Sequence, residues 1–168
     1  MYIGGAIFSD HASKYISVVL QANLTTHETL QAKDQFERMA RDYGVVIQQY
    51  VADNGSSFTS KAFTEHLSTF AQVIRFAGVG AHHQNISERD IQTIMSIARC
   101  NMLHSAIHWP EMADTQFWPQ SVMWAVYVFN RCPRQDTGLA PIDLFTRSRW
   151  EQRQFHDFIC VGMPRLHP

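Results

Sequence analysis

Two acidic residues, Asp53 and Glu88, are the strongest candidates for chemistry in this sequence. Asp53 follows a β-rich stretch and opens the turn-forming run DNGSSF, whereas Glu88 lies in the first turn of a predicted helix. Carboxylates on two separate elements can hold Mg²⁺ or Mn²⁺ and support phosphoryl transfer. Each residue also has a purely structural interpretation, because Asp-Asn-Gly is a common turn and acidic side chains favour helix N-termini.

Hydrophobic periodicity predicts the elements that position these acids. Strands and helices alternate in the order strand, strand, helix, strand, helix, strand, helix, helix, which is typical of an α/β sheet covered by helices. The expected strands are 6–8 and 15–20, joined by a turn at 10–13, then 45–52 and 73–76. The first expected helix begins at Thr25, which forms a capping box with Glu28, and ends at Gly44, and the second begins at Ser60. The fourth spans 118–130. The third has an apolar face made of Ile91, Ile94, Met95, Ala98 and Met102.

Composition indicates one packed domain in a chain of 168 residues. Hydrophobic residues make up 45% and charged residues 17%, which excludes a disordered or acidic-tail protein. The net charge of −1 argues against strong DNA binding by this chain alone. Cys100, Cys132 and Cys160 lack metal-site spacing and are expected to be free thiols. Neither a membrane span nor a targeting segment is predicted.

Several motifs together resemble the integrase catalytic core of Ty1/copia-type retrotransposons. They are GGAIFSDHASKYISVV, VADNGSSFTSKAF, GVGAHHQN with SER, IQTIMSIARCNM, and WPQSVMWAVYVFNRCP with GLAPIDLF. They occur in order at compatible spacing and cover residues 3–160. The resemblance implies a ribonuclease H-like mixed sheet flanked by helices. It also implies a core at 1–146 followed by a divergent tail at 147–168.

By this resemblance, Asp53 is the second Asp and Glu88 the Glu of a D,D-35-E triad that binds Mg²⁺ or Mn²⁺. The family acts on DNA by 3′-processing and strand transfer, so the implied partner is DNA at the element ends and the target. Residues implied near the DNA are Asn54, His82, His83 and Asn85, together with Arg89 on the Glu88 helix. Arg89 has a second interpretation as an ordinary helix-surface residue. The two histidines have a solvated-loop role as an equal alternative. A homodimer and a location in the nucleus or a virus-like particle are further expectations, and no membrane partner is expected.

The chain departs from the family pattern in two places. The motif FSDHASKY resembles the second strand of the family, so Asp10 is not expected to be catalytic, and the first, central strand with its Asp is expected to be missing. Thirty-four residues separate Asp53 from Glu88, one fewer than the family signature. We place the missing residue within the run NISER (85–89), in the loop before the helix, because the apolar pattern after Ile91 is intact. The sequence therefore predicts a marginal or rearranged fold and weakened metal binding.

Other residues with reactive or aromatic side chains receive structural interpretations. His104 and His108 have helical i, i+4 spacing but no third ligand, so a surface role is expected. Lys14 and Lys33 are expected on solvated faces. The aromatic residues Trp118, Trp124, Tyr127 and Phe129 are expected in the core or at a dimer surface.

Three functional hypotheses follow. The first is a fragment of an integrase core that is inactive alone. The second is a non-catalytic remnant that retains DNA binding or dimerisation. The third is another ribonuclease H-like nuclease whose acidic set includes Asp10.

Overall fold

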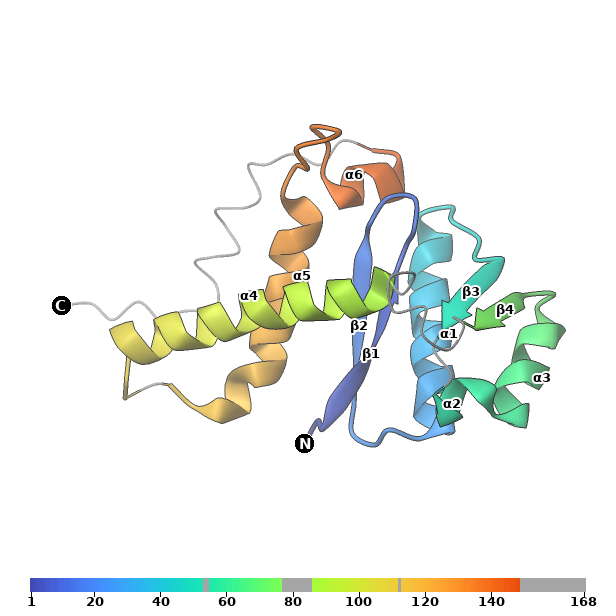
Figure 1. Ribbon diagram of the computed structural model, residues 1–168, viewed down its shortest axis with the longest axis horizontal. Coiled ribbons are helices and arrows are strands. Elements are labelled where there is room, and N and C mark those ends of the chain that lie inside the picture. The colour runs from blue at the N-terminus through green and yellow to red at the C-terminus, as the bar shows by residue number, and fades with distance from the viewer. Residues whose placement is uncertain (53–54, 77–85, 112, 149–168) are drawn as a thin grey trace.

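Strands β1 (Gly4–Ser9) and β2 (Ile16–Gln21) form the antiparallel hairpin predicted from the sequence. In its turn, Asp10 Oδ2 accepts hydrogen bonds from the Ser13 backbone N–H at 2.7 Å and the Ser13 hydroxyl at 2.6 Å. The computed structural model describes residues 1–52, 55–76, 86–111 and 113–148 (Figure 1).

Helix α1 (Thr26–Asp42) follows the hairpin and packs against both of its strands. The Thr25 side chain accepts from the Glu28 backbone N–H, as the predicted cap requires. The Glu28 carboxylate instead bonds Asn23, at 2.9 Å to its backbone N–H and 3.0 Å to its side chain, so the capping box is only half formed. Gly44 ends the helix with φ of +73°, a left-handed conformation that favours glycine.

A second, parallel ladder pairs β3 (Gln49–Ala52) with β4 (Val73–Phe76). Only the last four residues of the predicted strand 45–52 form a strand. Helices α2 (Ser56–Thr59) and α3 (Lys61–Thr69) connect the two strands, and the Ser60 side chain caps α3 through the Phe63 backbone N–H. The described residues thus contain two separate two-stranded sheets instead of one continuous sheet. This partial sheet confirms the expected fold class without its central strand.

Helix α4 (Ile86–His108) crosses the hairpin and packs along α5 (Trp118–Arg131), which follows the short 3₁₀ helix η2 (Thr115–Phe117) (Figure 1). The Ser121 hydroxyl donates to the Ala98 carbonyl at 2.7 Å between these helices. Side chains from β2, α4 and α5 form the core, namely Ile16, Ile94, Ala98, Val122, Ala125 and Val126. Trp118 and Phe129 pack against it, which confirms the core interpretation for these two aromatic residues.

The predicted apolar face of α4 is partly wrong. Ile94 and Ala98 are buried, but Ile91 and Met95 are 44% and 36% exposed. The buried side follows residues 94, 97, 98 and 101, because α5 covers the helix from that direction. The positions of apolar residues alone did not distinguish the predicted face from the neighbouring face that is buried.

Helix α6 (Pro141–Thr146) ends the described core and packs on α5. The proposed boundary at residue 146 stays a prediction, because 149–168 lie outside the described residues. Among the described residues, no helix combines the length and apolarity that crossing a membrane would require. Cys100 and Cys132 are free and exposed, as predicted, and Cys160 lies outside the described part of the chain.

Candidate active site

Asp53 comes directly after the last residue of β3, Ala52. The chain is described again from Gly55, whose carbonyl accepts the Phe58 backbone N–H at 3.0 Å and begins α2. Asp53 is therefore at a junction between a parallel strand and a helix, where α/β sheets commonly bind ligands. Asp53 and Asn54 themselves lie outside the described residues, so the directions of their side chains stay predictions.

Glu88 occupies the first turn of α4, as predicted, and its side chain is exposed. Ile94 is seven positions after Ser87, nearly two full turns, so Ser87 is in line with the buried side of the helix. Glu88 and Arg89 follow at about 100° steps and are both exposed. A carboxylate and a guanidinium are thus accessible at this helix end to a cation and to a phosphate.

The remaining residues implied near DNA, His82, His83 and Asn85, lie outside the described residues. The distance between the carboxylates of Asp53 and Glu88 also stays a prediction. Helix α4 already includes Ile86, so residues 86–89 of the NISER run belong to the helix and not to a loop, which corrects that part of the prediction. A one-residue shortening in the loop must come before Ile86. Within the described part of the chain, no three His, Cys, Asp or Glu residues are grouped to hold a metal ion. Glu88 offers the oxygen chemistry that Mg²⁺ prefers, but one carboxylate does not make a closed site.

Asp10 has a local structural role. Its carboxylate is engaged by Ser13, and its backbone carbonyl accepts from Lys14 N–H at 2.9 Å. Lys14 adopts φ of +62° in the same turn. These bonds explain Asp10 as the residue that closes the β1–β2 turn.

His104 and His108 lie on one face of α4, with ring centroids 4.2 Å apart. Both are exposed, and the His108 ring lies 5.7 Å from the ring of Trp109. Two imidazoles without a third described ligand fit the predicted surface role better than a zinc site.

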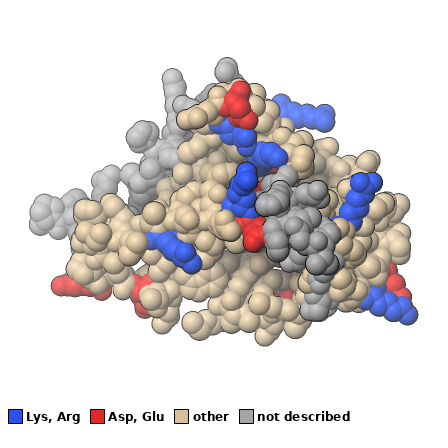
Figure 2. Space-filling view, viewed as in Figure 1, with Lys and Arg blue, Asp and Glu red and all other residues tan. Residues whose placement is uncertain are grey.

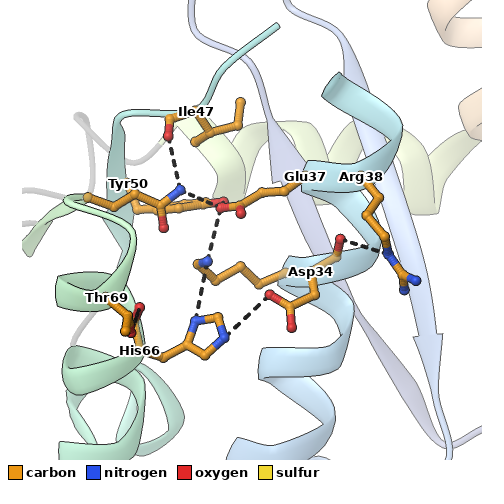
Figure 3. A network of polar contacts seen from close by, with 9 residues as sticks. Asp34, Glu37, Arg38, Ile47, Tyr50, His66 and Thr69 are labelled. Carbon is orange, nitrogen blue, oxygen red and sulfur yellow. Dashed lines mark hydrogen bonds and ion pairs between the residues drawn. The ribbon is translucent and has the colours of Figure 1, made fainter. Parts of the chain in front are cut away.

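Lys33 is not on a solvated face, which corrects the sequence interpretation. Its side chain is 0% exposed, and Nζ lies 3.0 Å from Glu37 Oε1 (Figure 3). The ammonium also lies 5.2 Å from the ring centroid of Phe70 and 3.5 Å from His66 Nδ1. His66 Nε2 in turn lies 3.5 Å from Asp34 Oδ1. The signal in the sequence was Glu37 at i+4 from Lys33, within the buried stripe of α1.

Glu37 is the centre of this network (Figure 3). Its Oε1 accepts from the Tyr50 hydroxyl at 2.5 Å and from Gln72 Nε2 at 2.7 Å. Burial alone would raise the pKa of Glu37, but the hydrogen bonds from Tyr50, Gln72 and Lys33 outweigh it and lower the pKa. Burial, followed by the neighbouring Glu37 carboxylate, raises the pKa of Tyr50. The network therefore ties β3 and the segment before β4 to α1, and so helps to position the strand that precedes Asp53.

Surface charge on the face drawn in Figure 2 is mixed. Lys and Arg side chains lie near the middle of this face, with acidic side chains among them. Arg134 and Asp136 form an ion pair at 2.8 Å. This mixed pattern agrees with the net charge of −1.

Comparison with solved structures identifies the architecture. The HTLV-2 integrase catalytic core with magnesium, in its trimeric form, matches with a TM-score of 0.65 and 18% identity over 84% of this chain and 83% of that chain. The fold is that of an integrase catalytic core. The dimeric form of the HTLV-2 core with magnesium matches with a TM-score of 0.62 and 17% identity, over 84% of this chain and 82% of that chain.

A third match, the simian T-cell lymphotropic virus intasome in complex with the PP2A regulatory subunit B56 gamma, has a TM-score of 0.61. Its identity is 13%, over 96% of this chain and 49% of that chain. No protein-family model and no curated protein matches the sequence. At these identities the comparisons establish the ribonuclease H-like integrase-core fold, whereas the Ty1/copia-type assignment rests on the sequence motifs.

Proposed function

We propose that this chain is a catalytic-core fragment of a Ty1/copia-type retrotransposon integrase that is inactive alone. Its ancestral activity is DNA integration by metal-dependent 3′-processing and strand transfer. The observation that carries the proposal is an integrase-core fold in which the two candidate acids follow β3 and begin α4.

In this proposal Asp53 and Glu88 hold Mg²⁺ or Mn²⁺, which when bound polarises the phosphodiester and activates the attacking oxygen. The HTLV-2 core, whose structure was solved with magnesium, supports the metal by resemblance. Asn54, His82, His83, Asn85 and Arg89 contact DNA, and the site of action is the nucleus or a virus-like particle. Arg89, exposed beside Glu88, supports the DNA-facing role of this helix end.

Two features support inactivity. Two carboxylates are fewer than a D,D-35-E triad supplies, and Mg²⁺ gives up its water reluctantly. The sheet of the described residues is also divided into two ladders, so strand pairing does not join β3, which precedes Asp53, to the hairpin on which α4 packs.

The first test is calorimetric titration of the chain with Mn²⁺. We expect weak binding that is lost in both Asp53→Asn and Glu88→Gln. The matched control is Glu65→Gln, which removes an exposed acid on α3 and should bind as the wild type does. Equal binding by all three variants would reject the assignment of the acids.

The second test is strand transfer on oligonucleotides that carry element ends. We expect no product with Mg²⁺ or Mn²⁺. Metal-dependent product that disappears in Glu88→Gln would keep the integrase assignment and overturn the inactivity.

A non-catalytic dimerisation module is the second candidate function, and exposed apolar side chains favour it. Leu103 and Ile107 on α4 are 63% and 76% exposed, and Phe117 and Met123 are 54% and 47% exposed. The HTLV-2 core is described in dimeric and trimeric forms. Sedimentation should show self-association that the double change Leu103→Lys, Ile107→Lys removes, and a monomer at high concentration would reject this candidate.

A further inference from the structure

His104 and His108 form a pair of imidazoles on the exposed surface of α4. The two residues are about one helical turn apart, and their ring centroids lie 4.2 Å apart with an interplanar angle of 45°. The Cβ atoms of residues at this spacing are about 5–6 Å apart on a helix, so the two rings lean toward each other. Both side chains are exposed, so an ion from solution can reach the pair.

The separation of the rings suits two nitrogens bound to one metal ion. A metal–nitrogen bond of about 2.0–2.1 Å places two nitrogens on adjacent coordination positions about 3 Å apart. A ring nitrogen lies off the centre of its ring, so a small rotation of the two rings, from centroids at 4.2 Å, can bring one nitrogen of each to that distance. Histidines at i and i+4 on one helix face are a known arrangement for sharing a metal ion.

Trp109 and the end of the helix favour a cation at this place. The centroid of the indole lies 5.9 Å from that of the His104 ring and 5.7 Å from that of the His108 ring. The Trp109 backbone N–H donates to the Ser105 carbonyl at 2.8 Å, which holds the indole beside the pair. This packing limits the rotamers of both histidines and so lowers the entropy cost of ligation. His108 is the last residue of α4, where the helix dipole favours positive charge.

We propose that His104 and His108 bind one Cu²⁺ or Ni²⁺ ion, each through one ring nitrogen, with water in the remaining coordination positions. Imidazole suits both ions, and square-planar or tetragonal sites of nitrogen and oxygen ligands are typical of them. Zinc sites use three or four protein ligands, which this pair does not supply. The site is therefore open and exchangeable, unlike a closed zinc centre.

This site is separate from the candidate active site. Glu88 lies in the first turn of α4, and His104 comes 16 positions later (104 − 88), which is about 24 Å along a helix. Figure 1 shows the C-terminal end of α4 extending past the hairpin, on the side away from β3 and β4. The ligand chemistry differs as well, because Mg²⁺ prefers carboxylate oxygens whereas Cu²⁺ and Ni²⁺ suit imidazole nitrogens. The inference therefore does not depend on the proposed function.

Titration of the full chain with NiCl₂, and in a second arm with CuCl₂, tests the proposal by calorimetry and by tryptophan fluorescence. We expect Cu²⁺ to bind more tightly than Ni²⁺ and millimolar Mg²⁺ not to compete with either ion. The bound ion should quench Trp109, and Trp109→Phe should remove this quenching while the heat of binding remains. Binding should weaken on acidification, because both imidazoles must be neutral to ligate.

The matched control keeps the number of histidines and changes only their spacing. In His108→Ala with Ala106→His the imidazoles are two positions apart and no longer face each other, and residue 106 is exposed, so the fold should tolerate the change. We expect Kd for Ni²⁺ to rise by about tenfold or more in this control and in His108→Ala, because the second ligand no longer acts within the same molecule. Cys100→Ser should bind as the wild type does.

The cysteine variant separates the proposal from an alternative ligand pair. Cys100 is an exposed free thiol four positions before His104 and is the other candidate partner for that imidazole. Loss of Ni²⁺ binding in Cys100→Ser would overturn the proposal, and so would wild-type affinity in His108→Ala or in the spacing control. Far-UV circular dichroism without metal should be the same in these variants, because each changed side chain is exposed.

Discussion

Lys33 and Glu37 form a buried ion pair whose partners come from several elements. Glu37 is bonded by Lys33 on α1, by Tyr50 on β3 and by Gln72 just before β4. A buried charge is stable only when it is paired and its remaining hydrogen-bonding capacity is satisfied. The pair therefore makes the contact between α1 and the β3–β4 unit specific.

Glu37→Gln is expected to destabilise the chain by about 3 kcal/mol, because it leaves Lys33 buried without a counter-ion. Replacing both partners, as Lys33→Met with Glu37→Gln, should recover most of this loss. Urea denaturation measures both effects. The control is Glu65→Gln in the exposed pair Lys61–Glu65, at 3.5 Å, which should change stability by less than about 1 kcal/mol.

The Glu37 carboxylate also predicts acid sensitivity. Its pKa is lower in the folded state than its ordinary value of 4.5, so the unfolded state binds the proton first as the pH falls. The stabilisation is complete above that value and is lost as the pH falls through the lower folded value. Stability measured from pH 6 to pH 3 should thus fall more steeply in the wild type than in Glu37→Gln. Parallel curves would contradict this account of the network.

Asn130 is the second buried polar residue with a long-range role. Its side chain bonds both backbone groups of Ile16, which is 0% exposed. Asn130→Ala is expected to destabilise the chain by about 2–4 kcal/mol, because a buried donor and acceptor both lose their partner. Asn130→Asp keeps an acceptor for the Ile16 N–H but loses the donor to the Ile16 carbonyl, so it should also destabilise the chain. Thermal unfolding measures the effect, and a melting temperature of Asn130→Ala equal to that of the wild type would contradict the assigned role.

At the scale of elements, local signals predicted the hairpin, the ends of α1 and the start of α3. The Asp10–Ser13 turn, the Thr25 and Ser60 caps and the Gly44 stop each act within a few residues. Helix α6 and the exact buried side of α4 were missed. Both depend on packing against α5, which is distant in sequence.

Helices α1 and α3 end in the same way, with one difference in the residue used. The Val45 N–H donates to the Ala40 carbonyl and the Gln72 N–H to the Leu67 carbonyl, each after a residue with positive φ. That residue is Gly44 in the first case and Ala71, at φ of +53°, in the second.

This comparison gives a paired prediction. Gly44→Ala should destabilise the chain by about 1 kcal/mol, and Ala71→Gly should stabilise it by a similar amount. Chemical denaturation of the two variants measures both. Changes of the same sign would contradict the backbone explanation.

At the scale of the whole molecule, the divided sheet predicts low stability. Strand pairing does not join the hairpin to the β3–β4 ladder among the described residues, and α1 connects them instead. We expect the isolated chain to melt below about 55 °C, in a broad transition. Circular dichroism measures this, and a sharp, cooperative melt above that temperature would contradict it.

The overall architecture was predictable only because several motifs resembled one family at once. Strand and helix order indicated an α/β fold, but neither periodicity nor composition could show that the sheet divides between β1 and β3. Such pairing is a long-range property. Local patterns gave only the i+4 spacing of Glu37 as a signal that Lys33 is buried. The burial itself depends on Tyr50, His66 and Phe70 from other elements.

The central claim is that Asp53 and Glu88 converge on one metal ion at the end of β3 and the start of α4. Paramagnetic broadening by Mn²⁺ in the NMR spectrum of the labelled chain tests it most directly. The account predicts that low Mn²⁺ concentrations broaden the amide signals around 52–55 and 86–89 together, and that Glu88→Gln removes the effect at both. Broadening of one segment without the other, or persistence of both in Glu88→Gln, would contradict it.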